Sequence, residues 1–208
     1  MDFVIYTDGA SHGNKRDSDC PASCAWAIFR KDIPSEGKKT FVTSGSMYQR
    51  GKTNNQMEMQ GILEGYSELV RSISSDIESR ATLSQFMKET VSVEFVTDSK
   101  YVEDNFYEYL PDWKSNGWRK TNGSQILNVE LWKQLDIVSS EVAKFSIRWV
   151  KGHLSDTINV AVDAMAQKAI QRGSTGYSGV QYRIEGDKTY FKSKLEHFPV
   201  YRQIGVTF

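Results

Sequence analysis

The chain has 208 residues, of which 39% are hydrophobic and 25% charged, a composition ordinary for a folded globular protein. Its 26 basic residues equal its 26 acidic ones, which argues against a protein that coats nucleic acid by bulk charge but leaves room for a local basic patch. No apolar run approaches the roughly 18 residues that a membrane span needs, and the acidic start Met1-Asp2 is unlike a signal peptide. We expect a cytoplasmic monomer without membrane contacts.

Three strands are expected in the first fifty residues. Phe3–Thr7 is a β-branched and aromatic run that ends at Asp8-Gly9, which is typical of a strand followed by a turn. Cys24–Phe29 and Thr40–Ser44 have the same character. The short, turn-rich links between the three runs predict an antiparallel meander.

Helical spacing of apolar residues begins after Asn54. Thr53 or Asn54 is the expected N-cap, and the apolar positions are Met57, Met59, Ile62, Leu63, Tyr66, Leu69, Val70 and Ile73. The polar stretch 74–89 either extends this helix or forms a second one. Val91–Thr97 then alternates as a fourth strand and ends at Asp98.

The next part of the chain continues the alternation of helices and strands. Tyr109–Gly123 is rich in Trp, Lys, Arg and Gly and predicts an exposed excursion. Gln125–Val142 has helical spacing, Phe145–Val150 reads as a fifth strand, and Thr157–Arg172 as a last helix. The order predicts an α/β fold with a five-stranded mixed sheet flanked by helices, in which the first, fourth and fifth strands are parallel.

The last residues form a C-terminal extension, so we divide the chain into a domain over 1–179 and an extension over 180–208. Within the extension, Val180–Ile184 and Thr189–Lys192 flank a polar turn, a pattern that indicates a hairpin.

Four acidic residues are candidates for a metal site. Asp8 and Asp98 follow strands that are expected to be parallel neighbours, so both should emerge at one edge of the sheet, where open α/β sheets bind ligands. Glu58 lies one turn into the first long helix, and Asp163 lies among small and apolar residues of the last helix. Such acids would repel each other unless divalent cations offset their charge, and oxygen ligands suit Mg²⁺ or Mn²⁺.

Each acid also has a simpler explanation. Asp8-Gly9 could be a turn, Asp98 could precede a helix cap, and Glu58 and Asp163 could be acids placed favourably in the helix dipole. For any single residue this explanation is at least as good. The combination of two strand-end acids and two helical acids in one compact domain favours the metal site.

Four sequence blocks carry a specific resemblance. Thr7–Ser11, Thr53–Met59, Thr97–Val102 and Trp149–His153, the last followed by Asp163, closely resemble the blocks of type 1 ribonuclease H, in the same order and over about residues 1–179. The resemblance implies endonucleolytic hydrolysis of the RNA strand of an RNA–DNA hybrid, giving 5′-phosphate and 3′-hydroxyl ends.

The resemblance also assigns the catalytic residues. Asp8, Glu58, Asp98 and Asp163 are expected to bind two Mg²⁺ ions, with Asp8 bridging them and Mn²⁺ as a possible substitute. His153 is expected to transfer a proton or to help product leave, since the pKa of histidine lies near neutrality; without the motif it would be a surface histidine.

The resemblance assigns the substrate contacts to two groups of residues. Contacts around the minor groove and the backbone of the hybrid are expected from Gly9, Asn14, Thr53, Asn54, Asn55 and Lys100. Lys100 stands where many relatives carry glutamine, so a phosphate contact could replace a 2′-hydroxyl contact there. The second group lies in a segment that resembles the basic protrusion of bacterial members and consists of Trp113, Lys114, Trp118, Arg119 and Lys120. The two tryptophans could instead pack the protrusion onto the domain.

Two alternative functions remain open. A structure-selective DNA nuclease would keep the fold and the metals, but the asparagines in their expected places argue against it. A non-catalytic hybrid-binding module would gain nothing from four mutually repelling carboxylates.

Overall fold

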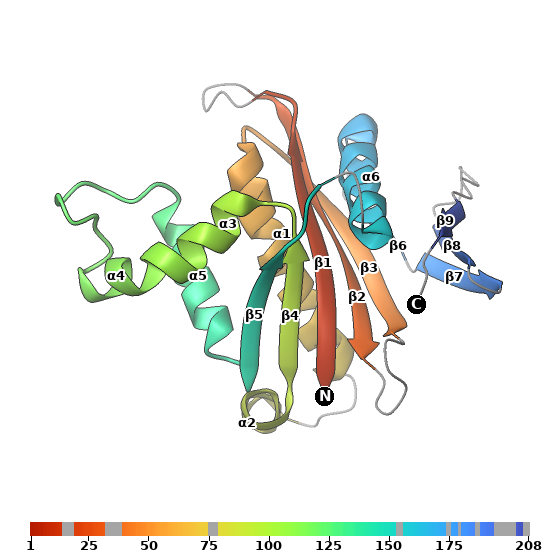
Figure 1. Ribbon diagram of the computed structural model, residues 1–208, viewed down its shortest axis with the longest axis horizontal. Helices are drawn as coiled ribbons and strands as arrows, with labels where there is room; N and C mark the ends of the chain where they lie inside the picture. The colour runs from red at the N-terminus through yellow and green to blue at the C-terminus, as the bar shows by residue number, and fades with distance from the viewer. Residues whose placement is uncertain are drawn as a thin grey trace.

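The structure is a computed structural model. It describes residues 1–13, 19–31, 39–74, 79–152, 156–173, 176–178, 180–185, 188–193 and 203–205. The main sheet has the strand order β5-β4-β1-β2-β3-β6 (Figure 1). Its strands are β1 (Asp2–Ser11), β2 (Pro21–Lys31), β3 (Lys39–Arg50), β4 (Ser92–Thr97), β5 (Lys144–Trp149) and β6 (Gly176–Ser178).

The strand pairing confirms the predicted topology. β1, β2 and β3 pair antiparallel as a meander, whereas β4 pairs parallel with both β1 and β5. The three-residue strand β6 was not predicted, and it pairs antiparallel with β3 at the edge of the sheet. Its identity depends on this long-range pairing, because three residues carry no recognisable period.

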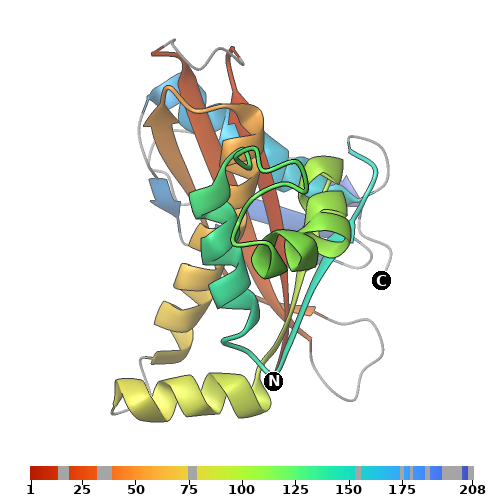
Figure 2. The ribbon, with the colours of Figure 1, turned by 90° about the vertical axis from the view of Figure 1, so that its left-hand side faces the viewer.

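Helices cover both faces of the sheet (Figures 1 and 2). They are α1 (Asn54–Ser74), α2 (Arg80–Thr90), α3 (Lys100–Asp104), the π-helix η1 (Asn105–Tyr109), α4 (Leu110–Ser115), α5 (Val129–Ser139) and α6 (Thr157–Arg172). The polar stretch after residue 74 therefore contains a second helix, one of the two expected outcomes. α6 matches its predicted bounds.

Two apolar cores hold these layers together. On one face of the sheet Trp26 and Phe95 pack beneath α1 and α5, together with the fully buried Trp132. On the other face Val4, Ala25 and Phe29 pack beneath α6. Full burial of each large side chain contributes about 1.5–3 kcal/mol, so the two cores fix α1 and α6 on opposite sides of β1.

The predicted exposed excursion over Tyr109–Gly123 begins with a helix, in which Leu110 and Trp113 are buried and the other residues are exposed. Residues 110–115 form α4, and Trp113 is only 9% exposed because its ring packs edge-on against Trp132 at 5.6 Å between ring centroids. Beyond the last residue of the helix, Ser115, Gly117 has a φ of +62°, and the Trp118 amide donates to the Trp113 carbonyl at 2.7 Å. This is the hydrogen bond of a Schellman helix end. The residues that follow, from 119 to 125, are exposed.

The extension forms a second, smaller sheet. β7 (Val180–Glu185) pairs antiparallel with β8 (Lys188–Ser193), as the hairpin pattern predicts, and β8 pairs with β9 (Gln203–Gly205). Among the residues that the structure describes, no helix is both long and apolar enough to cross a membrane.

Candidate active site

Strand β1 carries Asp8 past the end of its parallel neighbour. The pairing of β1 with β4 ends at Tyr6 and Val96, while β1 continues to Ser11 beside β2. The prediction that Asp8 begins a turn is therefore wrong, because Asp8 lies within the strand, opposite Ala25. The expected proximity still holds: Asp98 directly follows β4 and reaches the same edge of the sheet as Asp8.

Three of the predicted acids meet at this edge. Asp8, Glu58 and Asp98 each offer a carboxylate oxygen, and these oxygens lie within 4.8 Å of one another. Asp8 and Glu58 are only 5% and 4% exposed, and Asp98 is partly exposed. Asp163 approaches from α6, and its side chain shares a hydrogen bond with the carboxyl group of Asp8. All four predicted carboxylates are thus brought together.

Burial and mutual repulsion both work against ionisation at the site. Burial raises the pKa of Asp8 well above its usual range, and the charges of Glu58, Asp98 and Asp163 raise it further. Burial also raises the pKa of Glu58, followed by the charge of Asp98. Hydrogen bonds from Gly9, Thr97 and Asn54 oppose this rise only in part.

The start of α1 holds Glu58 in place. Thr53 is the N-cap, as one of the two predicted alternatives: its amide donates to the Gln56 Oε1 at 2.9 Å, and its Oγ1 accepts from the Gln56 amide at 3.4 Å. This reciprocal pair is a capping box. One turn later Asn54 Nδ2 donates to Glu58 Oε1 at 3.3 Å, and Thr97 Oγ1 lies 3.4 Å from Glu58 Oε2.

Two glycines let the backbone approach the carboxylates. A Cβ atom on Gly9 would lie 2.3 Å from the backbone nitrogen of Glu58, so only glycine lets β1 pass this close to α1. A Cβ atom on Gly152 would lie 2.4 Å from Oδ2 of Asp98. The indole Nε1 of Trp149 donates to the backbone carbonyl of Asp98 at 2.9 Å, which holds the backbone of Asp98 in place.

This donor set fits a divalent cation. The clustered ligand atoms are all carboxylate oxygens, as Mg²⁺ and Mn²⁺ prefer. A bound cation would offset the repulsion that raises the pKa values of Asp8 and Glu58. Because Gly9 and Gly152 have no side chain, the backbone can lie against Glu58 and Asp98 without displacing either residue.

The predicted substrate-binding residues near the acids differ in their surroundings. Asn55 is exposed and Asn54 is partly buried at the mouth of the site. Lys100 is held by Glu103 at 2.9 Å and Asp104 at 3.1 Å, with its ammonium 5.2 Å from the centre of the Trp149 ring. Asn14 and His153 lie outside the residues that the structure describes.

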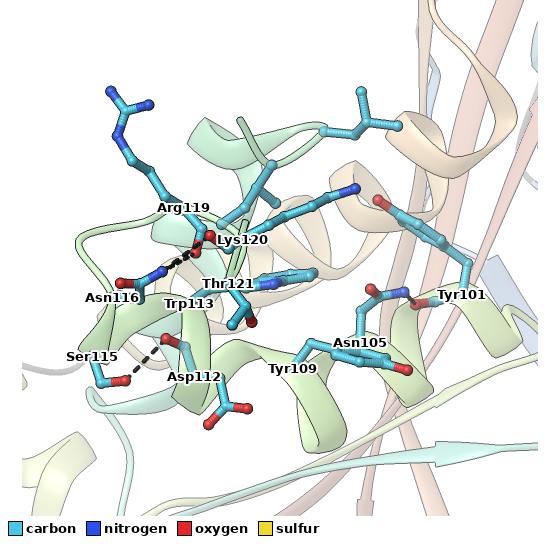
Figure 3. A pocket seen from close by; sticks show the side chains of 12 residues that line it. Tyr101, Asn105, Tyr109, Asp112, Trp113, Ser115, Asn116, Arg119, Lys120 and Thr121 are labelled. Atoms are coloured by element: carbon cyan, nitrogen blue, oxygen red, sulfur yellow. Dashed lines mark hydrogen bonds between the residues drawn. The ribbon is translucent and has the colours of Figure 1, made fainter. Parts of the chain in front are cut away.

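A cavity of about 630 Å³ lies between α3, η1, α4 and the segment after α4. Figure 3 shows the rings of Tyr101, Tyr109 and Trp113 around it. Arg119 and Lys120 line the same cavity. Neither Tyr101 nor Tyr109 was predicted from the sequence as part of a site, although the four-residue separation of Tyr109 and Trp113 is one that places side chains on one helix face.

The predicted binding residues of the protrusion also make contacts within the protein. Trp113 is buried, which supports the alternative that it packs the protrusion onto the domain. Trp118 packs against the same core. Lys114 pairs with Asp136 of α5 at 2.9 Å. Arg119 donates to the Gly123 carbonyl at 3.2 Å.

Comparisons with known proteins show which family the chain resembles. The sequence profile of the family described as RNase H matches residues 1–171. The chain is 32% identical over 169 residues to a ribonuclease H of Wolbachia pipientis wMel, covering 81% of this chain and 95% of that protein. It is 34% identical over 170 residues to a ribonuclease H of Paracidovorax citrulli, covering 81% and 94%.

Solved structures share the fold. The crystal structure of LC9-RNase H1, a type 1 RNase H with the type 2 active-site motif, superposes with a TM-score of 0.64 at 23% identity, covering 86% of this chain and 78% of that one. LC11-RNase H1 in complex with an RNA/DNA hybrid superposes with a TM-score of 0.53 at 17% identity, covering 82% and 97%.

Proposed function

The chain belongs to the ribonuclease H family of metal-dependent endoribonucleases, and we propose that it cleaves the RNA strand of RNA–DNA hybrids with two Mg²⁺ ions bound by Asp8, Glu58, Asp98 and Asp163. The products are a 5′-phosphate and a 3′-hydroxyl. The single observation that carries this proposal is the meeting of Asp8, Glu58 and Asp98, with oxygens within 4.8 Å, at the edge where α6 adds Asp163.

Each residue of the site has a defined task in this proposal. Bound cations would supply an activated water and would offset the negative charge that develops on the phosphate. The four carboxylates hold the cations, and the partly exposed Asp98 faces the incoming substrate. His153, in the segment after Gly152, transfers a proton or assists product release.

Substrate recognition is divided between two surfaces in the same proposal. Gly9, Asn14, Asn54 and Asn55 contact the 2′-hydroxyls and the backbone near the cut, with Thr53 holding the start of α1. Lys100 contacts phosphate only after giving up an ion pair with Glu103 or Asp104, which limits its contribution.

The protrusion forms the second surface. Its cavity combines the exposed cations Arg119 and Lys120 with the rings of Tyr101 and Tyr109, a mixture suited to a sugar–phosphate backbone. Trp113, Trp118 and Lys114 support this surface from behind, through the core and Asp136.

The proposal is tested with end-labelled duplexes of one sequence: RNA–DNA, RNA–RNA and DNA–DNA, together with single-stranded RNA. Each is incubated with Mg²⁺, with Mn²⁺ and with chelator. We expect cleavage only of the RNA strand of the hybrid, and none in chelator. Asp98→Asn is expected to abolish cleavage, since a metal ligand is lost, while hybrid binding stays measurable.

Other outcomes separate the alternatives. Cleavage of DNA would keep the fold and metal assignment and replace the substrate. Hybrid binding without cleavage in any metal would indicate a binding module. Wild-type turnover by Asp98→Asn would refute the assignment of the metal ligands. Glu89→Gln, which changes an exposed carboxylate of α2 that accepts a hydrogen bond from Gln85, serves as the control and should cleave normally.

A further inference from the structure

A tyrosine hydroxyl is buried on the α6 side of the sheet, two residues before Asp8. Tyr6 is only 2% exposed, and its ring packs edge-on against Phe29 at 5.9 Å between ring centroids. A phenylalanine would fill the same space without the cost of removing a hydroxyl from water. The hydroxyl must therefore be compensated by its partners.

Those partners come from separate parts of the chain. Lys39 Nζ, from the start of β3, donates to the Tyr6 hydroxyl at 2.7 Å. The carboxylate of Asp156 shares a hydrogen bond with the same hydroxyl, and Arg148 of β5 also contacts it. Lys39 and Arg148 balance the charge of Asp156, while Glu94 accepts from Arg148 Nε at 2.9 Å.

Asp156 has a second role at the start of α6. It is the N-cap, with Oδ1 accepting from the amides of Ile158 at 3.0 Å and Asn159 at 3.3 Å. One carboxylate thus joins the first turn of α6 to the hydroxyl on β1. The segment before it includes Gly152, whose backbone lies against Asp98.

Asp163 lies between two points at which α6 is fixed to the sheet. Asp156 is the first, and the second is Ala166, whose carbonyl accepts from the buried Ser23 Oγ of β2 at 2.6 Å. Tyr6 and Asp8 are two positions apart on β1, so they project from the same face. They contact Asp156 and Asp163, which are about two helical turns apart on α6.

We propose that the Tyr6–Asp156 hydrogen bond, supported by Lys39, positions α6 on β1 so that Asp163 completes the carboxylate site beside Asp8. Tyr6 and Asp156 are positioning residues, since both act through α6 and not as ligands of the cations. The inference rests on the proposed function, because it takes Asp163 as a metal ligand.

The expected consequence is a loss of metal affinity without a loss of fold. In Tyr6→Phe the apolar packing of α6, its Asp156 cap and the Ser23 bond all remain. Asp163 is held less tightly, so the concentration of Mg²⁺ at half-saturation should rise by about fivefold, the factor that corresponds to one ordinary intramolecular hydrogen bond.

The full-length chain offers a matched control. Tyr66 is also buried, at 7% exposure, and its hydroxyl donates to a carboxylate, Glu141 Oε2, at 3.0 Å, but on the opposite face of the sheet. Tyr6→Phe and Tyr66→Phe are titrated with Mg²⁺ alone, following the rise in Tm and the heat of binding. Both should lose similar stability, and only Tyr6→Phe should need more Mg²⁺.

A second variant separates positioning from general damage. Asp156→Ser keeps a good N-cap but is too short to reach the hydroxyl, so it should weaken Mg²⁺ binding to the same extent as Tyr6→Phe. The double variant should be no weaker than either single one. A wild-type Mg²⁺ response that Tyr6→Phe and Asp156→Ser both leave unchanged would overturn the inference alone. A wild-type chain without any Mg²⁺ response would overturn the proposed function as well.

Discussion

At the scale of single residues, Asp8 and Glu58 lower the stability of the metal-free fold but favour the binding of a cation. Both carboxyl groups are nearly fully buried, and both have neighbours of the same charge. Ionised carboxylates in this setting destabilise the metal-free fold, because burial and repulsion both disfavour the charged form. A bound divalent cation would offset this repulsion, so the same features favour cation binding.

This conflict predicts a pH-dependent effect of Asp8→Asn. The pKa of Asp8 is raised in the folded chain, so the folded state holds the proton more tightly than the unfolded state. The contribution of Asp8 to stability is therefore full below about pH 4, the ordinary carboxyl pKa, and is lost as pH rises toward the raised pKa of Asp8. In chelator at neutral pH, Asp8→Asn should raise Tm by about 3–6 °C.

The measurement is thermal unfolding in chelator from about pH 4 to 8, the range between the ordinary carboxyl pKa and neutrality. The advantage of Asp8→Asn should shrink as pH falls, and excess Mg²⁺ should reverse it, since the variant lacks a ligand. An advantage that stays constant with pH would show that Asp8 ionisation does not limit stability.

At the scale of elements, the π-helix η1 contributes a side chain that closes one edge of the sheet. β5 is the edge strand beside β4. The Tyr107 hydroxyl accepts from the Ile147 amide at 2.8 Å and donates to the Ile147 carbonyl at 3.0 Å. One hydroxyl thus takes the place of a neighbouring strand at this residue and blunts the edge.

Tyr107→Phe should therefore weaken the outer strand selectively. Two hydrogen bonds are lost while the exposed ring remains, so we expect about 1–2 kcal/mol of destabilisation. Hydrogen exchange should become faster at the Ile147 amide and stay unchanged in β1. Tyr109→Phe is the control, since Tyr109 lies in the same π-helix. Unchanged exchange at Ile147 would show that water replaces the hydroxyl without cost.

The elements that could be predicted from sequence are those with a clear period and a local end signal. The spacing in α6 ends at Gly173, whose φ of +62° suits glycine, and its bounds were predicted correctly. α5 begins only at Val129, later than the spacing predicts, because Asn128 adopts a φ of +60°. Strand β6 and the burial of Trp113 depend on partners far along the chain.

Site residues could likewise be predicted where the signal is local in the sequence, but not where it depends on distant residues. The blocks around Asp8, Glu58 and Asp98 were recognisable because each is a local pattern at the end or start of an element. The contact of Tyr6 with Asp156 and the close approach of Gly152 to Asp98 could not be predicted, because both depend on which residues the fold brings opposite them. Asp8-Gly9 misled the turn prediction, since its glycine serves the approach of β1 to α1 instead.

At the scale of the whole molecule, the matched family region and the extension are distinct. The family profile ends at residue 171, while β6 adds to the edge of the main sheet and β7–β9 form a sheet of their own. We propose the boundary near residue 179, with catalysis confined to residues 1–179 and the extension over 180–208 dispensable for it.

Truncation tests this boundary. A chain ending at Gly179 keeps β6 and should cleave hybrids with a kcat/KM within about twofold of the full chain, because no active-site residue is removed. A chain ending at Gly173 loses β6 and leaves the edge of β3 unpaired, so it should self-associate, as measured by sedimentation. A large loss of cleavage in the chain ending at Gly179 would assign the extension a part in catalysis.

The four carboxylates are spread along the chain from β1, the first strand, to α6, the last helix of the matched region. During synthesis on a ribosome, Asp8 leaves the exit tunnel long before Asp163. On the proposed function, an unfinished chain therefore lacks one metal ligand until α6 has emerged and docked on β1. Cleavage of hybrids would begin only once the chain has been synthesised beyond α6, so a partly made chain with three of the four carboxylates would stay inactive.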